Sequence, residues 1–168
     1  MKNRMIVEIK NLIKKFSIGG SYFTALNEIS LNIEKGEFSG LVGASGSGKT
    51  TLLNIIGGLD SPTSGNVKVL NKTISETSHT ERALIRRKNM GFIFQSYNLL
   101  PVYSVYENVE LPLILNKVEK NNRRQKVLDA IEAVGLSDKV NSRPNQLSGG
   151  QCQRTAIARA IVHNPALI

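Results

Sequence analysis

The sequence holds little of what several protein classes depend on. It has one cysteine, Cys152, in 168 residues, so an internal disulfide and a cysteine-rich metal site are excluded. No apolar run approaches the ~20 residues that span a bilayer. Residues 1–8 lack the long apolar stretch of a secretory signal, so none is expected. Aromatic residues make up 5% of the chain, too few to favour a platform that stacks nucleic-acid bases. These absences favour a protein of the reducing cytoplasm.

The length and charge of the chain narrow the class further. The length suits one domain with a sizeable core, and 40% hydrophobic residues is ordinary for a soluble protein. Lys and Arg outnumber Asp and Glu by 22 to 13, a net charge of +9. Such an excess suits a nucleic-acid partner or a place beside an anionic membrane leaflet. The basic residues are scattered, apart from 86–88 and 123–126 in predicted helices, so no nucleic-acid partner is expected.

One stretch carries specific chemistry. Residues 43–50, Gly-Ala-Ser-Gly-Ser-Gly-Lys-Thr, fit the phosphate-binding pattern G-x-x-x-x-G-K-[ST]. Glycines let the backbone curl until several N–H groups point at one phosphate. Lys49 adds a positive charge near the β- and γ-phosphates, and the Thr50 hydroxyl suits Mg²⁺. A buried strand over 38–42 is expected before the loop. A helix over 51–56 is expected after it, where the helix N-terminus favours anions.

The rest of the amino-terminal half predicts antiparallel strands around this unit. Apolar residues alternate over 5–10 and 25–33, which indicates two half-buried strands with a Gly19-Gly20 turn between them. A short strand is expected over 67–70. The capping box of Ser78 and Glu81 then predicts a helix over 81–88.

The second half predicts mainly helices. The apolar run 90–94 indicates a strand that ends at Gln95. A capping box at Ser104 and Glu107 predicts a helix over 107–115, bent or ended by Pro112. Further expected elements are an amphipathic helix over 121–134 closed by Gly135, a helix from the Leu147–Gln151 stretch to about His163, and the start of a buried strand at 166–168.

Three motifs in this order resemble the ATP-binding subunit of ABC transporters: the phosphate loop, Gln95 after an apolar strand, and Leu147-Ser148-Gly149-Gly150-Gln151 opening a helix. The stretches 92–101 and 107–113 look most like the macrolide-export and lipoprotein-release branch. The resemblance implies an α/β fold: a P-loop NTPase core with an N-terminal antiparallel β subdomain and an inserted α-helical subdomain. The expected parts of this single domain are 1–94, 95–145 and 146–168.

The resemblance also implies roles for single residues. Phe16 sits where the family stacks an aromatic ring on adenine. Gln95 would reach Mg²⁺ and the attacking water, and the segment Gln95–Glu107 would couple to an integral membrane permease subunit. Thr50 and Gln95 are therefore the implied Mg²⁺ contacts. The implied ATP contacts are Phe16, Gly43, Ser45, Gly46, Ser47, Gly48, Lys49, Thr50 and Thr51.

The Leu147–Gln151 stretch has the residues of a second anion-binding site. Ser148, Gly149 and Gly150 put a hydroxyl and unobstructed N–H groups at a helix N-terminus, which is a second anion site. In the family this site, with Gln151, grips ATP held by the opposite subunit. The resemblance therefore implies a homodimer or heterodimer of ATPase subunits closed around two ATP molecules. It also implies a cytoplasmic location on the inner face of the membrane, and suggests export or extraction of a substrate.

The family's Mg²⁺-organising aspartate and catalytic glutamate would follow the apolar residues 166–168, and the chain contains neither. We therefore expect a fragment of a longer subunit that, alone, hydrolyses ATP at background rate for want of a general base.

Two alternatives remain open on the sequence. A non-transport ABC-type ATPase acting on nucleic acid or the ribosome would share these motifs. Against it, the helical insertion is short and holds no zinc ligands or long heptads. A GTPase or small-molecule kinase would share only the phosphate loop. The N-K-x-D pattern of a GTPase is matched imperfectly at 116–119, where Glu119 replaces Asp.

Overall fold

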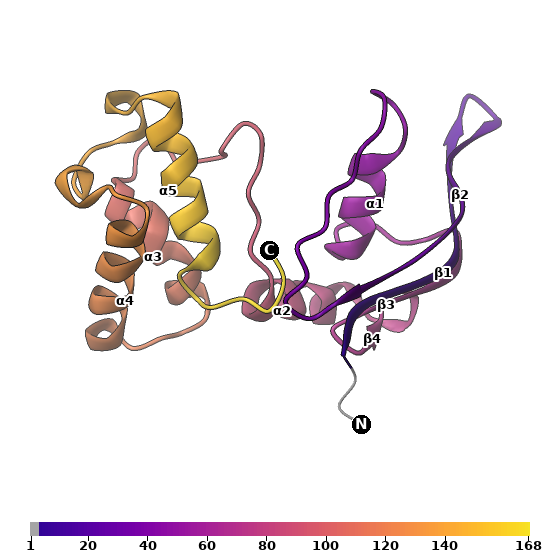
Figure 1. Ribbon diagram of the computed structural model, residues 1–168, viewed down its shortest axis with the longest axis horizontal. Coiled ribbons are helices and arrows are strands. Elements are labelled where there is room, and N and C mark those ends of the chain that lie inside the picture. Colours follow the sequence, from indigo (N-terminus) through magenta and orange to yellow (C-terminus); the bar gives the residue numbers. More distant parts are fainter. Residues whose placement is uncertain (1–3) are drawn as a thin grey trace. The chain divides into compact units, whose positions relative to one another are not determined.

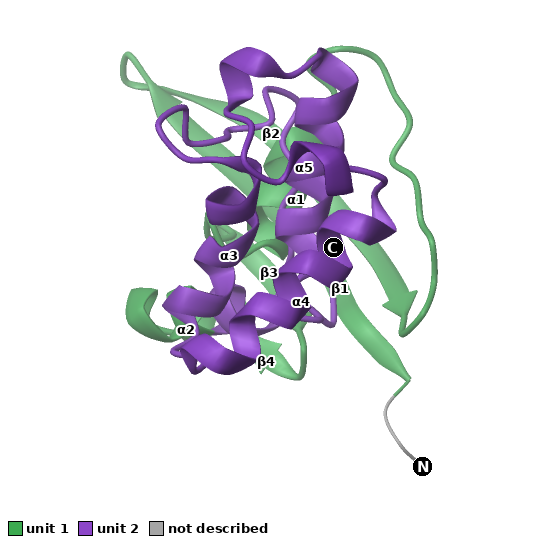
Figure 2. Cartoon of the chain, turned by 90° about the vertical axis from the view of Figure 1, so that its left-hand side faces the viewer, with its two compact units in different colours: residues 1–84 green, residues 85–168 purple. Residues whose placement is uncertain are grey.

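The computed structural model describes residues 4–168, so the first three residues of the amino-terminal stretch considered above lie outside it. Contacts between Cα atoms divide the chain into two compact units, residues 1–84 and 85–168 (Figure 2). The three-part division expected from the sequence stays a prediction.

Unit 1 is built on a four-stranded antiparallel sheet of order β2-β1-β3-β4 (Figure 1). Its strands are β1 (Met5–Ile18), β2 (Ser21–Glu34), β3 (Ser64–Val69) and β4 (Lys72–Thr73), and a 3₁₀ turn, η1 (Ile74–Glu76), follows. The turn between β1 and β2 places Gly19 and Gly20 at φ values of 57° and 83°, where glycine carries no steric penalty. The expected strands are confirmed, and β1 and β2 extend well beyond the predicted bounds.

The sheet supplies much of the core of unit 1. Val7 and Ile9 of β1 are buried as the predicted alternation requires, but Ile6 and Leu12 are buried as well, because register shifts interrupt the pairing of β1 with β2. Strand β3 adds buried positions of its own. The helix after the phosphate loop, α1 (Lys49–Ile56), also buries residues here. The buried side chains of these elements are Ile6, Val7, Ile9, Leu12, Leu26, Leu52, Ile55, Ile56, Val67 and Val69.

The stretch 38–42 is a correction to the sequence prediction. It forms no strand, and its side chains are not buried: Phe38 and Val42 are 101% and 99% exposed. A buried parallel strand needs hydrogen-bonded neighbours to satisfy its backbone and covering helices to bury its side chains. Within residues 4–168 no strand pairs with this segment. The segment has the apolar composition of a buried strand, but within the described part of the chain it lacks the adjacent strands that would hydrogen-bond to it.

Unit 2 is a helical cluster. The boundary between the units falls within α2 (His79–Asn89), and unit 2 continues with α3 (Val105–Leu115), α4 (Lys120–Ala133) and α5 (Gly149–Ile161). Two 3₁₀ turns, η2 (Ser137–Lys139) and η3 (Pro144–Gln146), link α4 to α5. Figure 1 shows α3, α4 and α5 packed together. Their shared core consists of Val105, Val109, Leu113, Val127, Ala130, Ile131, Leu136, Ala158 and Val162.

The helix ends follow their sequence signals. Both capping boxes form: the Ser78 Oγ accepts from the Glu81 amide at 3.2 Å, and Ser104 and Glu107 repeat the arrangement at α3. Helix α4 ends in two bonds that satisfy its last carbonyls, from the Gly135 amide to Glu132 O and from the Leu136 amide to Ile131 O. Gly135 accordingly has φ 66°.

The helix expected over 107–115 is confirmed, with Pro112 inside it. The strand expected over 90–94 needs correction. The run 90–94 forms only an isolated parallel bridge between Met90 and Leu167, and Ile168 is 65% exposed rather than buried. The Gly91 amide donates to Leu167 O at 2.9 Å, so the two segments begin a parallel pairing. A parallel pair without further strands beside it is too small to propagate.

No helix formed by residues 4–168 is both long and apolar enough to cross a membrane.

Candidate functional site: two helix N-termini and the turn after Gln95

The phosphate loop of unit 1 leads directly into the first turn of α1. Gly48 is the residue before the helix and adopts φ 87°, a left-handed conformation open to glycine. Gly46 is also left-handed, at φ 79°. The Ser47 amide donates to Ala44 O at 3.3 Å, which closes the curl. The N–H groups of the first helical turn lack partners within the helix and lie at its positive end, as an anion site requires.

Lys49 lies inside this curl. Its Nζ donates to the carbonyl oxygens of Gly43 and Ala44 at 2.8 and 2.7 Å and approaches Ser47 Oγ at 3.4 Å. All three partners are neutral. A phosphate oxygen is a stronger partner for an ammonium than a neutral carbonyl, so the residues present fit a bound phosphate chain.

The loop also packs closely on the sheet. A Cβ on Gly48 would stand 2.6 Å from Ala25 O and 2.8 Å from Leu26 Cδ2, both on β2. A Cβ on Gly43 would stand 2.8 Å from Ser47 Oγ, a side-chain atom that can rotate away. Gly48 is therefore the glycine that lets the loop approach β2 so closely.

Phe16 lies on β1 of the same unit and is 37% exposed. The Lys14 Nζ stands 4.8 Å from the ring centroid, at cation–π distance. The same ammonium donates to Asp60 Oδ1 at 2.6 Å and to Ser61 O at 2.9 Å. Partial burial raises the pKa of the Asp60 carboxyl, but hydrogen bonds from Lys14 and the Ser61 amide outweigh it, and the pKa lies below its ordinary value. Asp60 thus stays ionised and holds Lys14 beside the ring.

The Mg²⁺ contacts predicted from the sequence lie in different units. The Thr50 hydroxyl is exposed in the first turn of α1, and Gln95 is exposed at the start of a turn in unit 2. Residues 4–168 contain no group of three His, Cys, Asp or Glu side chains placed to hold a metal. A hard cation here would depend on the Thr50 oxygen and on oxygens from a bound phosphate chain.

The turn after Gln95 has an unusual backbone. Tyr97 and Asn98 adopt φ values of 60° and 47°, in the left-handed region that residues with a Cβ rarely enter. The Tyr97 amide donates to Phe94 O at 3.0 Å and the Asn98 amide to Ser96 O at 2.6 Å. Two consecutive left-handed residues reverse the chain directly after Gln95.

The Leu147–Gln151 stretch opens α5 as predicted. Ser148 is the N-cap: its Oγ accepts from the Gln151 amide at 3.3 Å, and its own amide donates to Gln151 Oε1 at 2.8 Å. Ser148, Gly149 and Gly150 are exposed. A Cβ on Gly150 would meet nothing within 4 Å, and one on Gly149 would meet only the Tyr97 hydroxyl, at 3.4 Å. The first turn of α5 is therefore exposed and unobstructed, as an anion site would require, and the Tyr97 hydroxyl lies near it.

Two further residues, Asn108 and Arg159, hold the backbone of this region although they belong to none of the sequence motifs. Asn108 of α3 is fully buried: its Oδ1 accepts from the Leu100 amide at 2.8 Å, and its Nδ2 donates to the carbonyls of Leu100, Tyr103 and Ser104. Arg159 of α5 reaches the carbonyls of Tyr97 and Asn98. In each case, the only hint in the sequence was a polar residue placed among the apolar residues of a helix.

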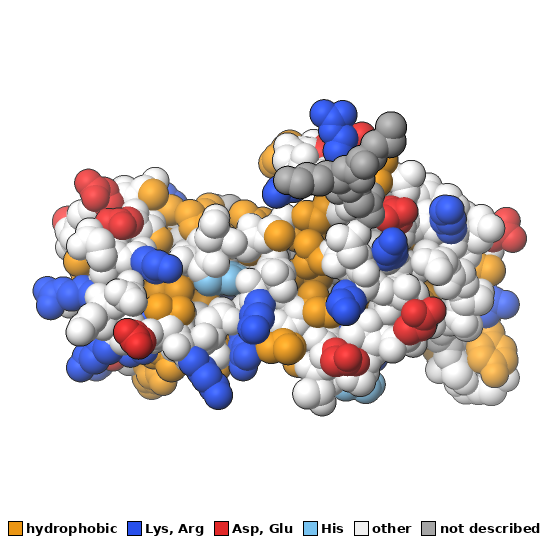
Figure 3. Space-filling view, turned by 90° about the horizontal axis from the view of Figure 1, so that it is seen from below, with side chains coloured by type: hydrophobic (Ala, Val, Ile, Leu, Met, Phe, Trp, Pro, Cys, Tyr) orange, Lys and Arg blue, Asp and Glu red, His pale blue; other side chains and the backbone are white. Residues whose placement is uncertain are grey.

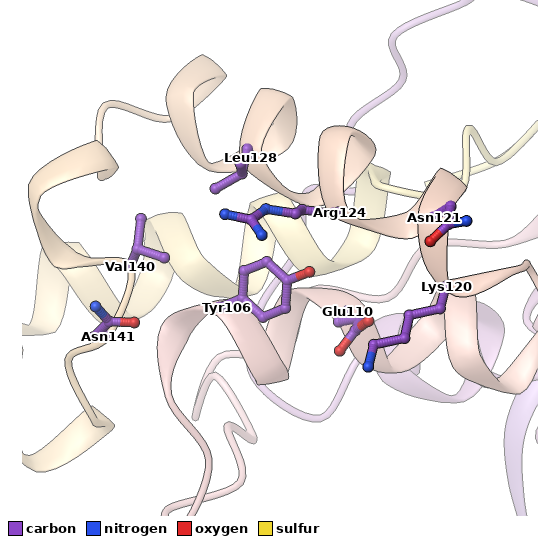
Figure 4. A pocket seen from close by; sticks show the side chains of 8 residues that line it. All are labelled: Tyr106, Glu110, Lys120, Asn121, Arg124, Leu128, Val140 and Asn141. Carbon is purple, nitrogen blue, oxygen red and sulfur yellow. The ribbon is translucent and has the colours of Figure 1, made fainter.

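A hollow of about 600 Å³ on unit 2 contains none of the predicted site residues. Figure 4 shows that Tyr106, Glu110, Lys120, Arg124 and Leu128 border it, between α3 and α4. Burial, with the nearby Glu110 carboxylate, raises the pKa of the Tyr106 hydroxyl. The hollow is lined by both acidic and basic side chains, and none of them is a residue predicted to contact the nucleotide.

Cys152 and His163 lie at positions that suit a structural role. Cys152 is half-buried, with Sγ 3.7 Å from Pro144 O, as fits a small helix residue rather than a nucleophile. His163 lies just after α5, with Nε2 3.1 Å from Met90 O.

Comparison with known proteins places this geometry in a family. The family model described as "ABC transporter" matches residues 26–168. The chain is 47% identical over 163 residues to the uncharacterized ABC transporter ATP-binding protein MJ1508 of Methanocaldococcus jannaschii, and 45% identical over 163 residues to the uncharacterized ABC transporter ATP-binding protein YknY of Bacillus subtilis. These alignments cover 97% of this chain and 73% and 71% of the two relatives.

Solved structures agree. The ATP-binding cassette MJ0796, in a dimeric post-hydrolysis state bound to ADP and Pi, superimposes with a TM-score of 0.87 at 45% identity, covering 95% of this chain and 70% of that one. A second dimeric structure of MJ0796, a bacterial ABC transporter cassette, has the same TM-score at 44% identity. The phosphate loop, the antiparallel sheet and the helices of unit 2 are therefore those of a known fold, and the chain belongs to the family of ABC transporter ATP-binding proteins.

Proposed function

We propose that this chain binds ATP in unit 1, with the triphosphate on the curl of residues 43–51 and adenine stacked on the ring of Phe16. One observation carries the proposal: Lys49 Nζ and the left-handed Gly48 meet at the N-terminus of α1, so charge, N–H groups and helix dipole converge on one small volume. When bound, ATP with Mg²⁺ would supply the γ-phosphate bond that hydrolysis breaks. The Thr50 hydroxyl and the Gln95 amide oxygen are the proposed Mg²⁺ contacts on this chain.

The second anion site is proposed to serve a partner's nucleotide. A chain that binds one ATP has no need of two phosphate-gripping helix N-termini. Support comes from the exposed, capped start of α5 and from the dimeric state of MJ0796. Two ATPase subunits, alike or different, would then close head-to-tail around two ATP molecules, each held by one subunit's loop and the other's Ser148, Gly149, Gly150 and Gln151.

The work of the subunit is proposed to be transport. The segment Gln95–Glu107 would dock on an integral membrane permease, which would place the protein in the cytoplasm on the inner face of the membrane. The segment is suited to docking, because Val102 is 69% exposed while Asn108 fixes the backbone beneath it. The branch resembled by residues 92–101 and 107–113 favours export or extraction of a substrate.

ATP hydrolysis is the activity of the family, and Gln95 is the proposed residue that orients the attacking water. We propose that this chain alone turns ATP over at background rate, because hydrolysis needs a general base and none of the residues assigned to this site is acidic.

Action on nucleic acid is the weaker candidate. Figure 3 shows Lys and Arg side chains interspersed with Asp and Glu on the face in view, rather than gathered into a stripe. A backbone-tracking surface needs basic side chains on one face.

The test of ATP binding is a titration of the chain with ATP and Mg²⁺ by calorimetry. Lys49→Ala removes the ammonium and should weaken affinity roughly 100-fold, the value of a strong charged contact to phosphate. Lys35→Ala, in the exposed turn after β2, is the matched control and should leave affinity within about twofold. Equal affinity in the wild type and the Lys49 variant would overturn the proposal.

A further inference from the structure

Arg159 binds two consecutive backbone carbonyls of the turn after Gln95. Its Nη1 donates to Asn98 O at 2.6 Å and its Nη2 to Tyr97 O at 2.6 Å. A guanidinium presents its donors in a rigid fork, so a pair of parallel short bonds fixes direction as well as distance. Burial lowers the pKa of Arg159 from a value so high that the group stays charged. The fork therefore acts at full charge in a partly water-excluded place.

The carbonyls that Arg159 holds belong to the strained pair. Tyr97 and Asn98 are both left-handed, and for Tyr97 the bulky side chain makes this conformation costly. Such a backbone persists only where its surroundings determine it. The Arg159 fork is part of these surroundings, together with the bonds within the turn from the Tyr97 amide to Phe94 O and from the Asn98 amide to Ser96 O.

The side chain of the same turn extends toward the start of this helix. The Tyr97 hydroxyl lies near Gly149, close enough that a Cβ there would stand 3.4 Å away. Arg159 and Gly149 lie near opposite ends of α5. The turn after Gln95 is therefore bonded to α5 near the end of the helix and lies close to its N-terminus, which carries Ser148.

We propose that Arg159 is a positioning residue that fixes the Gln95 turn to α5, so that Gln95 and the anion-binding start of α5 are displaced together. This inference rests on the proposed function for the role of Gln95. The tether itself stands on contacts within unit 2 alone.

Amide hydrogen exchange of the full chain tests the tether without nucleotide. Arg159→Lys keeps the charge but loses the fork, and should speed exchange at the Tyr97 and Asn98 amides by about tenfold or more. The Tyr103 amide, which donates to Leu100 O at 3.1 Å in the neighbouring turn, should be unchanged. Arg154→Lys, at an exposed position of α5, is the control. Unchanged exchange at Tyr97 and Asn98, or equal acceleration at all amides, would overturn the proposal.

A double-mutant cycle tests whether Arg159 acts through Gln95. The readout is the ratio of ATP affinity with Mg²⁺ to ATP affinity with EDTA. Gln95→Ala should lower the ratio, Arg159→Lys should lower it similarly, and the double variant should lower it no further. Additive losses would overturn positioning through Gln95. If Gln95→Ala leaves the ratio unchanged, the proposed role of Gln95 is wrong, and the exchange result alone then decides whether the tether exists.

Discussion

Asn108 shows how one side chain can set the path of a whole loop. It satisfies one amide and three carbonyls between Leu100 and Ser104, and no part of it reaches solvent. An aspartate has nearly the same shape but cannot donate to the three carbonyls. Hydrogen-bonding capacity therefore restricts the residue at position 108 more than side-chain size does.

Asn108→Asp should lower the free energy of unfolding by about 3 kcal/mol, because it buries a carboxylate against carbonyl oxygens. Urea unfolding followed by circular dichroism measures the loss. Asn122→Asp, exposed near the start of α4, is the matched control and should stay within about 0.5 kcal/mol of wild type. A loss at Asn108 no larger than at Asn122 would contradict the role assigned to this amide.

His163 makes stability depend on pH. Met90 O can only accept, so Nε2 carries the hydrogen, and Nδ1 makes no hydrogen bond within residues 4–168. Burial lowers the pKa of His163 more than the bond to Met90 raises it. The folded chain therefore resists protonation, and this stability is present above the unfolded pKa of about 6.5 and is lost as pH falls through the lower folded pKa.

The free energy of unfolding should accordingly fall between pH 7.5 and pH 5.5, and His163→Gln, whose amide can still donate to Met90 O, should weaken that fall. His79→Gln, at the exposed start of α2, is the control and should leave the fall as in wild type. The explanation fails if the two variants behave alike.

At the scale of elements, β1 and β3 meet at a point that only glycine permits. Gly65 of β3 has φ 88°, and a Cβ there would overlap the Asn11 carbonyl. Gly20, in the turn after β1, has φ 83° with nothing within 4 Å. The two positions share a backbone conformation and differ in the space beside it.

Gly65→Ala should therefore destabilise the chain by at least about 2 kcal/mol more than Gly20→Ala, whose cost is left-handed strain alone, about 1–2 kcal/mol. Thermal or urea unfolding of both variants gives the difference. Equal losses would mean that the close approach contributes nothing.

Elements whose signals are local could be predicted from the sequence, and those that need distant neighbours could not. The capping boxes at Ser78 and Ser104, and the Gly135 terminus, depend on residues within a few positions of each other, and all form as expected. The stretches 38–42 and 90–94 have the composition of buried strands, but a strand exists only where another pairs with it. The same reason hid Arg159, since its partners lie about sixty positions earlier in the chain.

At the scale of the whole molecule, two helix N-termini within residues 4–168 are proposed as anion sites, at α1 in unit 1 and at α5 in unit 2. The central claim is that they serve different nucleotides, the first the chain's own and the second a partner's. A chain that used both on one nucleotide would need no second copy. The two arrangements predict opposite results when defective chains are mixed.

The most direct measurement is sedimentation velocity of two variants, alone and mixed, with ATP and Mg²⁺. Lys49→Ala disables the chain's own site and Ser148→Arg blocks the site offered to a partner, so neither variant alone should form an ATP-dependent dimer. In the mixture, the intact Ser148 of one chain meets the intact Lys49 of the other, and a heterodimer with one complete site should appear. A mixture that remains monomeric while the wild type dimerises, or a Ser148→Arg chain that dimerises unimpaired, would contradict the account.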